Sequence, residues 1–292
     1  MLLRKFGRHD LNVSALGLGA GPLGDARVDE SEVARLLHGA LELGVTLFDT
    51  APSYGVSEER LGRHLGERRK DVVLSTKLGY GVPGIPDWTG PCISAGVDTA
   101  LQRLRTDWID IAHLHSCPAE VLADEDILRA LEDAVSAGKV RIAAYSGDGD
   151  GLRAAKKLPV FGAFQFSHNI VDQEAIHEGL PLAVGTIGKR SLLNAVFASS
   201  QADPGRPDLQ EYHRRWAALP NDLSEELERL GTARSALRFA LHSDGVCACL
   251  VGTTRLKNLR DNVEAVAEGP LEAGLVRRLQ AWWGRNGWPG LV

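Results

Sequence analysis

The stretch Thr46-Leu-Phe-Asp-Thr-Ala-Pro-Ser-Tyr-Gly55 decides the fold of this chain. Its first residues are apolar and predict a buried strand that ends in the carboxylate of Asp49. A Pro-Ser turn then leads to the phenol of Tyr54, and a helix is predicted at 57–66. A strand that ends in polar groups and continues into a helix is the repeating unit of a (β/α)8 barrel, whose active site lies at the C-terminal ends of its strands.

Length and composition fit one such barrel. The chain has 292 residues, of which 44% are hydrophobic and 24% charged, so a large core is expected. A net charge of −5 and a pI near 6.0 argue against nucleic acid or an acidic membrane as partner. The four cysteines show no CxxC spacing, so no metal site is expected and the thiols fit the cytoplasm. Neither a signal peptide nor a membrane-spanning segment is predicted.

Strands and helices alternate along the rest of the chain. Residues 2–14 predict a short hairpin that precedes the barrel. Barrel strands are predicted at 15–20, 45–49, 71–77, 108–115, 139–146, 161–167, 180–186 and 246–251. Helices are predicted at 57–66, 93–104, 125–136, 150–157, 208–218, 223–229, 232–242 and 255–267, with others capped by Asp29 and following Leu271. The pattern contains no linker or repeat, so residues 1–292 are expected to form one α/β barrel domain.

Four polar residues follow three consecutive predicted strands. Asp49 and Tyr54 follow the second strand, Lys77 ends the third and His115 ends the fourth. Neighbouring strands lie about 4.8 Å apart, so these side chains are expected to share one small site. We expect proton transfer by Tyr54, with the ammonium of Lys77 lowering the pKa of the phenol and Asp49 holding the lysine. His115 is expected to bind a substrate oxygen or to assist the transfer.

Each of these residues also has a structural interpretation. An aspartate after a strand is often a cap, a lone tyrosine usually packs, and a lysine at a strand end is usually solvated. A histidine can be a satisfied core residue, which is the interpretation we prefer for His113. The functional interpretation depends on the coincidence of all four at successive strand ends.

The chain resembles the aldo-keto reductase family over nearly its whole length. The resemblance is carried by Phe-Asp-Thr-Ala-Pro-Ser-Tyr-Gly (48–55), Ser-Thr-Lys-Leu-Gly (75–79), Asp-Trp-Ile-Asp-Ile-Ala-His-Leu-His (107–115), Gly-Lys-Val-Arg (138–141), Gln165, Asn169 and Gly252-Thr-Thr with Asp261-Asn262. The resemblance implies a barrel that binds NAD(P)H without a Rossmann domain and transfers hydride to a carbonyl. It implies that Tyr54 is the general acid, that Lys77 and Asp49 tune it, and that His115 orients the carbonyl.

The resemblance also implies a set of cofactor-binding residues. These are Gly21, Asp49, Ser146, Gln165, Lys189, Arg190, Leu192, Gly252, Thr253, Thr254, Asn258, Asp261 and Asn262. Two positions depart from the family: Gly147 stands where an asparagine usually binds the carboxamide, and Lys189 stands where many members stack an aromatic ring on the nicotinamide. Asn258 stands where an arginine often binds the 2′-phosphate, a role that Arg255 or Lys257 could take. NADP(H) is therefore expected over NAD(H), by a moderate margin.

The sequence leaves the substrate and two rival functions open. Loops expected at 78–91 and 187–210, with a turn at 203–207, are predicted to shape the pocket, and Tyr80 and Trp88 are the expected substrate contacts. The expected substrate is a small carbonyl compound or sugar. One rival is a Schiff-base enzyme with Lys77 as nucleophile, which the charge of Asp49 would oppose. The other is a nucleotide sensor or subunit of the same fold with little turnover.

Overall fold

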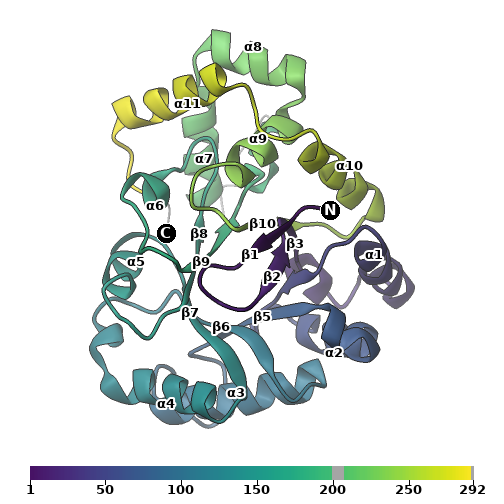
Figure 1. Cartoon of the computed structure of the whole chain (residues 1–292), viewed down its shortest axis with the longest axis vertical. Helices are drawn as coiled ribbons and strands as arrows, with labels where there is room; N and C mark the ends of the chain where they lie inside the picture. Colours follow the sequence, from purple (N-terminus) through teal and green to yellow (C-terminus); the bar gives the residue numbers. More distant parts are fainter. Residues whose placement is uncertain (199–206, 291–292) are drawn as a thin grey trace.

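A ring of parallel strands forms the centre of the molecule in this computed structural model, which describes residues 1–198 and 207–290 (Figure 1). The strand order is β10-β3-β4-β5-β6-β7-β8-β9, and the two ends of this order pair with each other. The barrel strands are β3 (Leu16–Gly19), β4 (Leu47–Asp49), β5 (Val73–Leu78), β6 (Ile109–His115), β7 (Val140–Ser146), β8 (Ala163–Ser167), β9 (Gly185–Lys189) and β10 (Ala248–Gly252). The predicted (β/α)8 barrel is confirmed.

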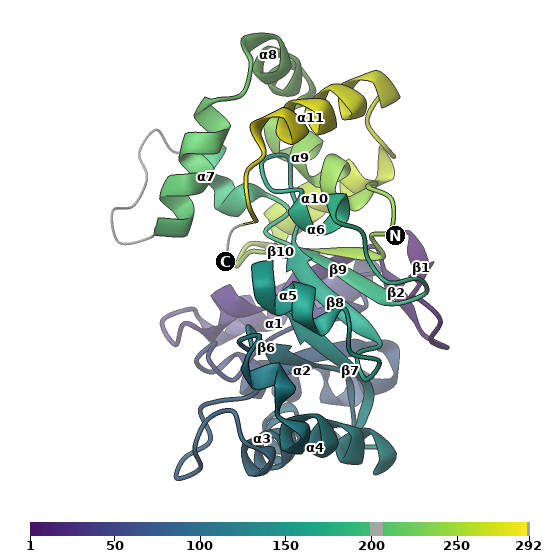
Figure 2. The ribbon, with the colours of Figure 1, turned by 90° about the vertical axis from the view of Figure 1, so that its left-hand side faces the viewer.

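Helices surround the ring of strands. They are α1 (Glu30–Glu42), α2 (Ser57–Leu65), α3 (Gly90–Leu104), α4 (Glu125–Ser136), α5 (Gly149–Ala155), α6 (Glu174–His177), α7 (Pro207–Ala217), α8 (Asn221–Leu230), α9 (Thr232–Leu241), α10 (Leu256–Ala267) and α11 (Ala273–Asn286). Short 3-10 turns are η1 (Gly21–Gly24), η2 (Gly66–Asp71), η3 (Val121–Ala123) and η4 (Leu193–Ala198). Figure 2 shows α7, α8 and α11 at one end of the molecule, where buried Tyr212, Trp282 and Trp283 belong to one apolar cluster. Within the described residues, no helix has the length and apolar character needed to cross a bilayer.

The predicted hairpin is confirmed and covers the N-terminal end of the barrel. It consists of β1 (Leu3–Lys5) and β2 (Asn12–Ser14), which pair antiparallel and lie over the ring of strands in Figure 1. Its turn carries Phe6, which is fully buried in one cluster with Leu47, Ile111 and other apolar residues of the barrel strands. Apolar side chains therefore close this end of the barrel, and the opposite end is left for polar groups.

The seventh barrel strand lies later in the chain than the sequence predicted. The prediction at 180–186 is wrong, since the strand is Gly185–Lys189. Leu182 is almost fully exposed and Ala183 has a φ of 60°, so the apolar residues before Gly185 form a turn on the surface. The shift places Lys189 at the C-terminal end of the strand.

The two predicted long loops contain more regular structure than expected. Helix α3 begins at Gly90 because the Thr89 side chain caps it, so the first loop is shorter than 78–91. Part of 187–210 belongs to β9, η4 and α7. The turn predicted at 203–207 lies mostly at 203–206, outside the described residues.

The turn η1 packs directly on the segment that follows β4. The backbone N–H of Val56 donates to the carbonyl of Gly24 at 3.2 Å. A Cβ at Gly24 would overlap the carbonyl oxygen of Tyr54 far inside van der Waals contact. A side chain at this position would therefore force the two backbones apart.

We expect Gly24→Ala to destabilise the protein by about 1–3 kcal/mol, the usual cost of overpacking a rigid contact. Gly66→Ala is the matched control, because a Cβ there meets nothing within 4 Å and the residue has helical dihedral angles. The control should leave the free energy of unfolding unchanged or raise it slightly. Urea unfolding measures both, and equal effects of the two substitutions would contradict the close contact.

Candidate active site

A buried aspartate forms the centre of the polar end of the barrel. Asp49 Oδ1 accepts hydrogen bonds from Lys77 Nζ at 2.5 Å, Ser75 Oγ at 2.7 Å and Gln165 Nε2 at 2.9 Å. The donors come from β5 and β8, and Asp49 ends β4. The side chains of Lys77 and Asp49 are only 1% and 5% exposed. Charge-assisted bonds in such a buried place are strong and hold both groups in one geometry.

Lys77 has little freedom to act as a nucleophile. Besides Asp49, its ammonium donates to the carbonyl of Thr50 at 2.9 Å, which leaves one N–H. Burial lowers the pKa of Lys77, and the charge of Asp49 opposes this shift. Because the amine is enclosed and paired, the Schiff-base interpretation is disfavoured.

The ring of Tyr54 lies beside the ring of His115. The two rings are 6.3 Å apart between centroids and meet at 89°. Burial raises the pKa of Tyr54 above its ordinary value, and the negative charge of Asp49 adds to the rise. The expected lowering of this pKa by Lys77 was therefore wrong, since that charge is already compensated by Asp49. At neutral pH Tyr54 is a phenol that can donate a proton.

His115 is a neutral imidazole held by Tyr80. Burial, with the charges of Lys77 and Lys189, lowers the pKa of His115 to about 3. The Tyr80 hydroxyl is hydrogen-bonded to His115 Nδ1 and to Ser53 Oγ. If Tyr80 donates to Nδ1, the proton of the neutral ring is on Nε2, which becomes a donor for a ligand.

The two expected substrate contacts lie together on this side of the site. Tyr80 stacks on His115, with 5.5 Å between ring centroids, and Trp88 packs against the edge of Tyr80 at 6.1 Å. Trp88 also lies over Gly79, where a Cβ would overlap the indole ring. The loop after β5 therefore carries an aromatic wall next to the imidazole.

Two residues of the site were not recognised in the sequence. Ser75 links Asp49 to His113, whose Nε2 lies 3.0 Å from Ser75 Oγ. Its signal was the spacing of two from Lys77, which places both on one face of β5. Asp148 binds Lys189 at 2.8 Å, and its signal was the strand end Ser-Gly-Asp-Gly. His113 is a core residue as expected, and it also supports Asp49 indirectly through its contact with Ser75.

A cavity of about 490 Å³ opens beside these groups. Asp49, Tyr54 and Gln165 form part of its wall. The remaining wall consists of Gly19, Gly21, Pro22, Lys189, Arg190, Ser191, Leu192, Asn194, Ala195, Leu209, Leu250, Val251 and Gly252. Its volume is that of a small-molecule site. The cavity brings together six of the residues expected to bind the cofactor, namely Gly21, Gln165, Lys189, Arg190, Leu192 and Gly252.

The segment after β9 lines this cavity in an unusual backbone conformation. Arg190, Asn194 and Ala195 have φ angles of 58°, 49° and 62°, in the left-handed region. Arg190 Nη1 donates to Ser167 Oγ at 3.2 Å, and its carbonyl accepts from Asn169 Nδ2 at 3.1 Å. Strained backbone of this kind persists only where neighbouring contacts hold it, and it is common at ligand sites.

The other predicted cofactor residues lie in two further places. Ser146 is buried at the end of β7 and donates to Gln165 Oε1 at 2.8 Å. Thr253 caps the turn into α10, because its Oγ1 accepts from the backbone of Arg255 at 3.1 Å. Thr254 precedes that helix, Asn258 lies in its first turn, and Asp261 and Asn262 lie near its middle; all four are partly or fully exposed. None of these four lines the cavity, so they form a separate outer part of the predicted site.

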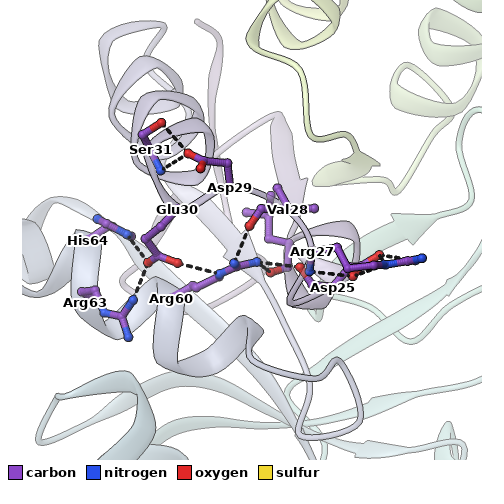
Figure 3. A network of polar contacts seen from close by, with 10 residues as sticks. Asp25, Arg27, Val28, Asp29, Glu30, Ser31, Arg60, Arg63 and His64 are labelled. Atoms are coloured by element: carbon purple, nitrogen blue, oxygen red, sulfur yellow. Dashed lines mark hydrogen bonds and ion pairs between the residues drawn. The ribbon is translucent and has the colours of Figure 1, made fainter.

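A buried arginine holds the loop that carries Gly21 and Pro22 (Figure 3). Arg60 donates to the carbonyls of Leu23 at 2.7 Å, Asp25 at 2.9 Å and Val28 at 2.6 Å. It also binds Glu30, which is bound in turn by Arg63 and His64 of the same helix. One side chain of α2 therefore fixes the cavity wall between β3 and α1.

The Aldo/keto reductase family matches residues 15–283 of the chain. L-galactose dehydrogenase of Arabidopsis thaliana is 27% identical, with 91% of this chain and 88% of that protein covered. L-glyceraldehyde 3-phosphate reductase of Escherichia coli K12 is 28% identical with the same coverage. The solved aldo-keto reductase AKR11C1 from Bacillus halodurans, in its holo form, superposes with a TM-score of 0.78 at 25% identity, covering 96% of each chain.

The chain belongs to the aldo/keto reductase family. It is an NAD(P)-dependent oxidoreductase that interconverts carbonyl compounds and alcohols.

The cavity fits a nicotinamide cofactor in its polar groups and in its shape. The amide of Gln165 has one N–H and one lone pair left after its bonds to Asp49 and Ser146, enough for a carboxamide. Gly21 and Gly252 leave the wall open, and a Cβ at Gly21 would stand 3.7 Å from the Tyr54 ring. Side chains there would fill the space that a flat ring needs.

We expect Arg60→Met to lower the free energy of unfolding by about 2–5 kcal/mol, because three carbonyls and Glu30 lose a buried charged donor. Arg63→Met is the matched control, since Arg63 binds the same Glu30 but is 48% exposed, against 6% for Arg60. Its cost should stay below about 1 kcal/mol. Urea unfolding compares them, and similar losses would mean that Arg60 is an ordinary surface cation.

Proposed function

We propose that this protein reduces a small carbonyl compound with Tyr54 as the general acid. The observation that carries the proposal is the phenol of Tyr54, kept protonated beside the neutral His115 and sharing one cavity wall with Asp49, the partner of Lys77. General acid catalysis needs a proton within hydrogen-bond reach of the developing alkoxide. The bound nicotinamide supplies the hydride in this reaction.

Each polar residue then has a distinct role. Tyr54 donates its proton to the carbonyl oxygen in reduction and accepts it back in the reverse direction. Asp49 holds Lys77 in a fixed position, and Ser75 fixes Asp49. His115 Nε2 donates a hydrogen bond that orients the carbonyl, because Tyr80 occupies Nδ1. Gln165 and Ser146 bind the carboxamide.

We propose a small aldehyde, ketone or sugar as the substrate. The relatives named L-galactose dehydrogenase and L-glyceraldehyde 3-phosphate reductase support this class. The aromatic wall of Tyr80 and Trp88 supports a compact substrate that packs against rings. The acidic net charge supports the absence of a nucleic-acid partner.

The sensor alternative is not favoured. A protein that only binds the nucleotide has no need for a buried carboxylate with three donors on one oxygen, which costs desolvation. We further propose that the whole chain, 1–292, acts as one barrel domain. The four free cysteines support a location in the reducing cytoplasm.

We propose NADP(H) as the preferred cofactor, with Arg255 binding the 2′-phosphate. Arg255 precedes α10, a helix whose first backbone N–H groups favour anions. Among the described residues no side chain pairs with Arg255, whereas Lys257 is paired with Asp261 at 2.7 Å. Asn258 carries no charge, so the preference should be moderate.

We expect Tyr54→Phe to lower kcat by about 10²- to 10⁴-fold, the usual contribution of a general acid. Only a hydroxyl at the cavity wall is lost, so thermal stability and NADPH affinity should stay near those of the unmodified protein. Steady-state kinetics over a panel of aldehydes, ketones and sugars tests this, with fluorescence titration for the cofactor. Near-normal kcat in the variant would sink the assignment.

We expect Arg255→Ala to raise the Kd of NADPH about 10- to 100-fold and to leave the Kd of NADH nearly unchanged, as expected for one charge-assisted phosphate contact. Lys257→Ala is the matched control and should change neither constant much. Both nucleotides can be titrated by the fluorescence of the six tryptophans. If Arg255→Ala weakens both nucleotides equally, Arg255 supports the structure of the loop and does not bind the phosphate. Tighter NADH binding by the unmodified protein would overturn the NADP(H) assignment.

A further inference from the structure

A second lysine–carboxylate pair lies across the barrel mouth from the first. Lys189 Nζ is 2.8 Å from Asp148 Oδ2. Lys189 ends β9 and Asp148 follows β7, whereas Lys77 is on β5. In the closed strand order, β5 and β9 are separated by three strands on either side. The site therefore has a cation on each of two opposite strands, and the proposed reaction uses only the first.

Hydrogen bonds from Ser167 hold Asp148 in place, and Asp148 in turn holds Lys189. Its Oδ1 accepts from the backbone N–H of Ser167 at 2.6 Å, and its Oδ2 accepts from Ser167 Oγ at 3.0 Å. The Asp148 side chain is 5% exposed. A buried carboxylate with these partners cannot rotate away without losing them. The ammonium of Lys189 is thus anchored at a set place in the wall.

The cation of this pair faces the cavity and the carboxylate does not. Lys189 is part of the cavity wall with Tyr54 and Gln165, and Asp148 is not. The Lys189 side chain is 20% exposed. Its ammonium has three N–H donors, of which Asp148 takes one, so two remain for a ligand. The charge also reaches across the site, because it contributes to lowering the pKa of His115 and Lys77.

We propose that Lys189 makes this site bind reduced nicotinamide more tightly than oxidised nicotinamide. The inference rests on the proposed function, in which the nicotinamide lies in this cavity beside Tyr54 and Gln165. The oxidised ring carries a positive charge and the reduced ring is neutral. A fixed ammonium in a poorly solvated wall repels the former, and it can donate to the carboxamide oxygen of either form. The negative charge of Asp148, next to Lys189, offsets part of this repulsion.

The two members of the pair therefore have opposite effects on one measurable ratio. We define this ratio as the Kd of NADP⁺ divided by the Kd of NADPH. Removing the positive charge should lower the ratio, whereas removing the negative charge should raise it. Both nucleotides share the adenosine half, so changes there cancel. A pair that only ties β7 to β9 would weaken both nucleotides alike or neither.

The experiment titrates the full-length protein with NADP⁺ and with NADPH, followed by tryptophan fluorescence. Lys189→Met should lower the ratio by roughly 5- to 50-fold, the range for one charge removed from a partly desolvated site. Lys189→Gln should lower the ratio by a similar factor, and agreement between the two variants would exclude a packing defect caused by the methionine. Asp148→Asn should raise it, and Lys189→Arg should keep it.

Lys156→Met is the matched control. Lys156 is also a mostly buried lysine in an ion pair, with Glu178 at 3.1 Å, but it is not part of the cavity wall. The ratio should not change in this variant. If both nucleotides bind and the ratio stays the same in Lys189→Met, Lys189→Gln and Asp148→Asn, the inference is overturned. If the unmodified protein binds neither NADP(H) nor NAD(H), the proposed cofactor site itself fails, which is a distinguishable result.

Discussion

One oxygen atom, Asp49 Oδ1, receives three hydrogen bonds, and the geometry of the site depends on it. The donors are Lys77, Ser75 and Gln165, which lie on two different strands. A carboxylate this deeply buried is tolerated only when it is paired and hydrogen-bonded. The barrel meets this requirement through its register, which sets Asp49 opposite Ser75 and Ser146 opposite Gln165. Removing Lys77 would leave the buried charge of Asp49 uncompensated, and removing Ser75 or Gln165 would leave its oxygen with fewer hydrogen bonds.

The two ends of the barrel have different physical roles. Phe6 and the apolar first halves of the strands close the N-terminal end and supply stability by burial. The C-terminal end can then hold two ion pairs and several buried polar groups, each costly by itself. Arg60 adds a further constraint, because it fixes the loop of Gly21 from outside the ring. Contacts within the protein thus fix the cavity wall, which reduces the ordering needed on binding.

The sequence predicted the barrel. It also predicted that Asp49, Tyr54, Lys77 and His115 share one end of it, because strand ends in this fold meet at one place. It could not predict contacts between distant strands in detail. The Asp148–Lys189 pair depends on the position of β9, which was placed about five residues too early because the apolar run before Gly185 looked like a strand. The pKa of Tyr54 was predicted in the wrong direction, since the balance of burial and two opposite charges follows from distances. Arg60 resembled an ordinary helix surface residue until its three carbonyl partners were placed.

The central claim is that Asp49 and Lys77 act as one unit in supporting catalysis by Tyr54. A double-mutant cycle on kcat with Asp49→Asn and Lys77→Met tests it most directly. If the pair acts as a unit, each single substitution should lower kcat by a similar large factor, and the double variant should be little worse than either. Losses in the double variant that equal the product of the single losses would contradict the account, because they would show two residues contributing independently.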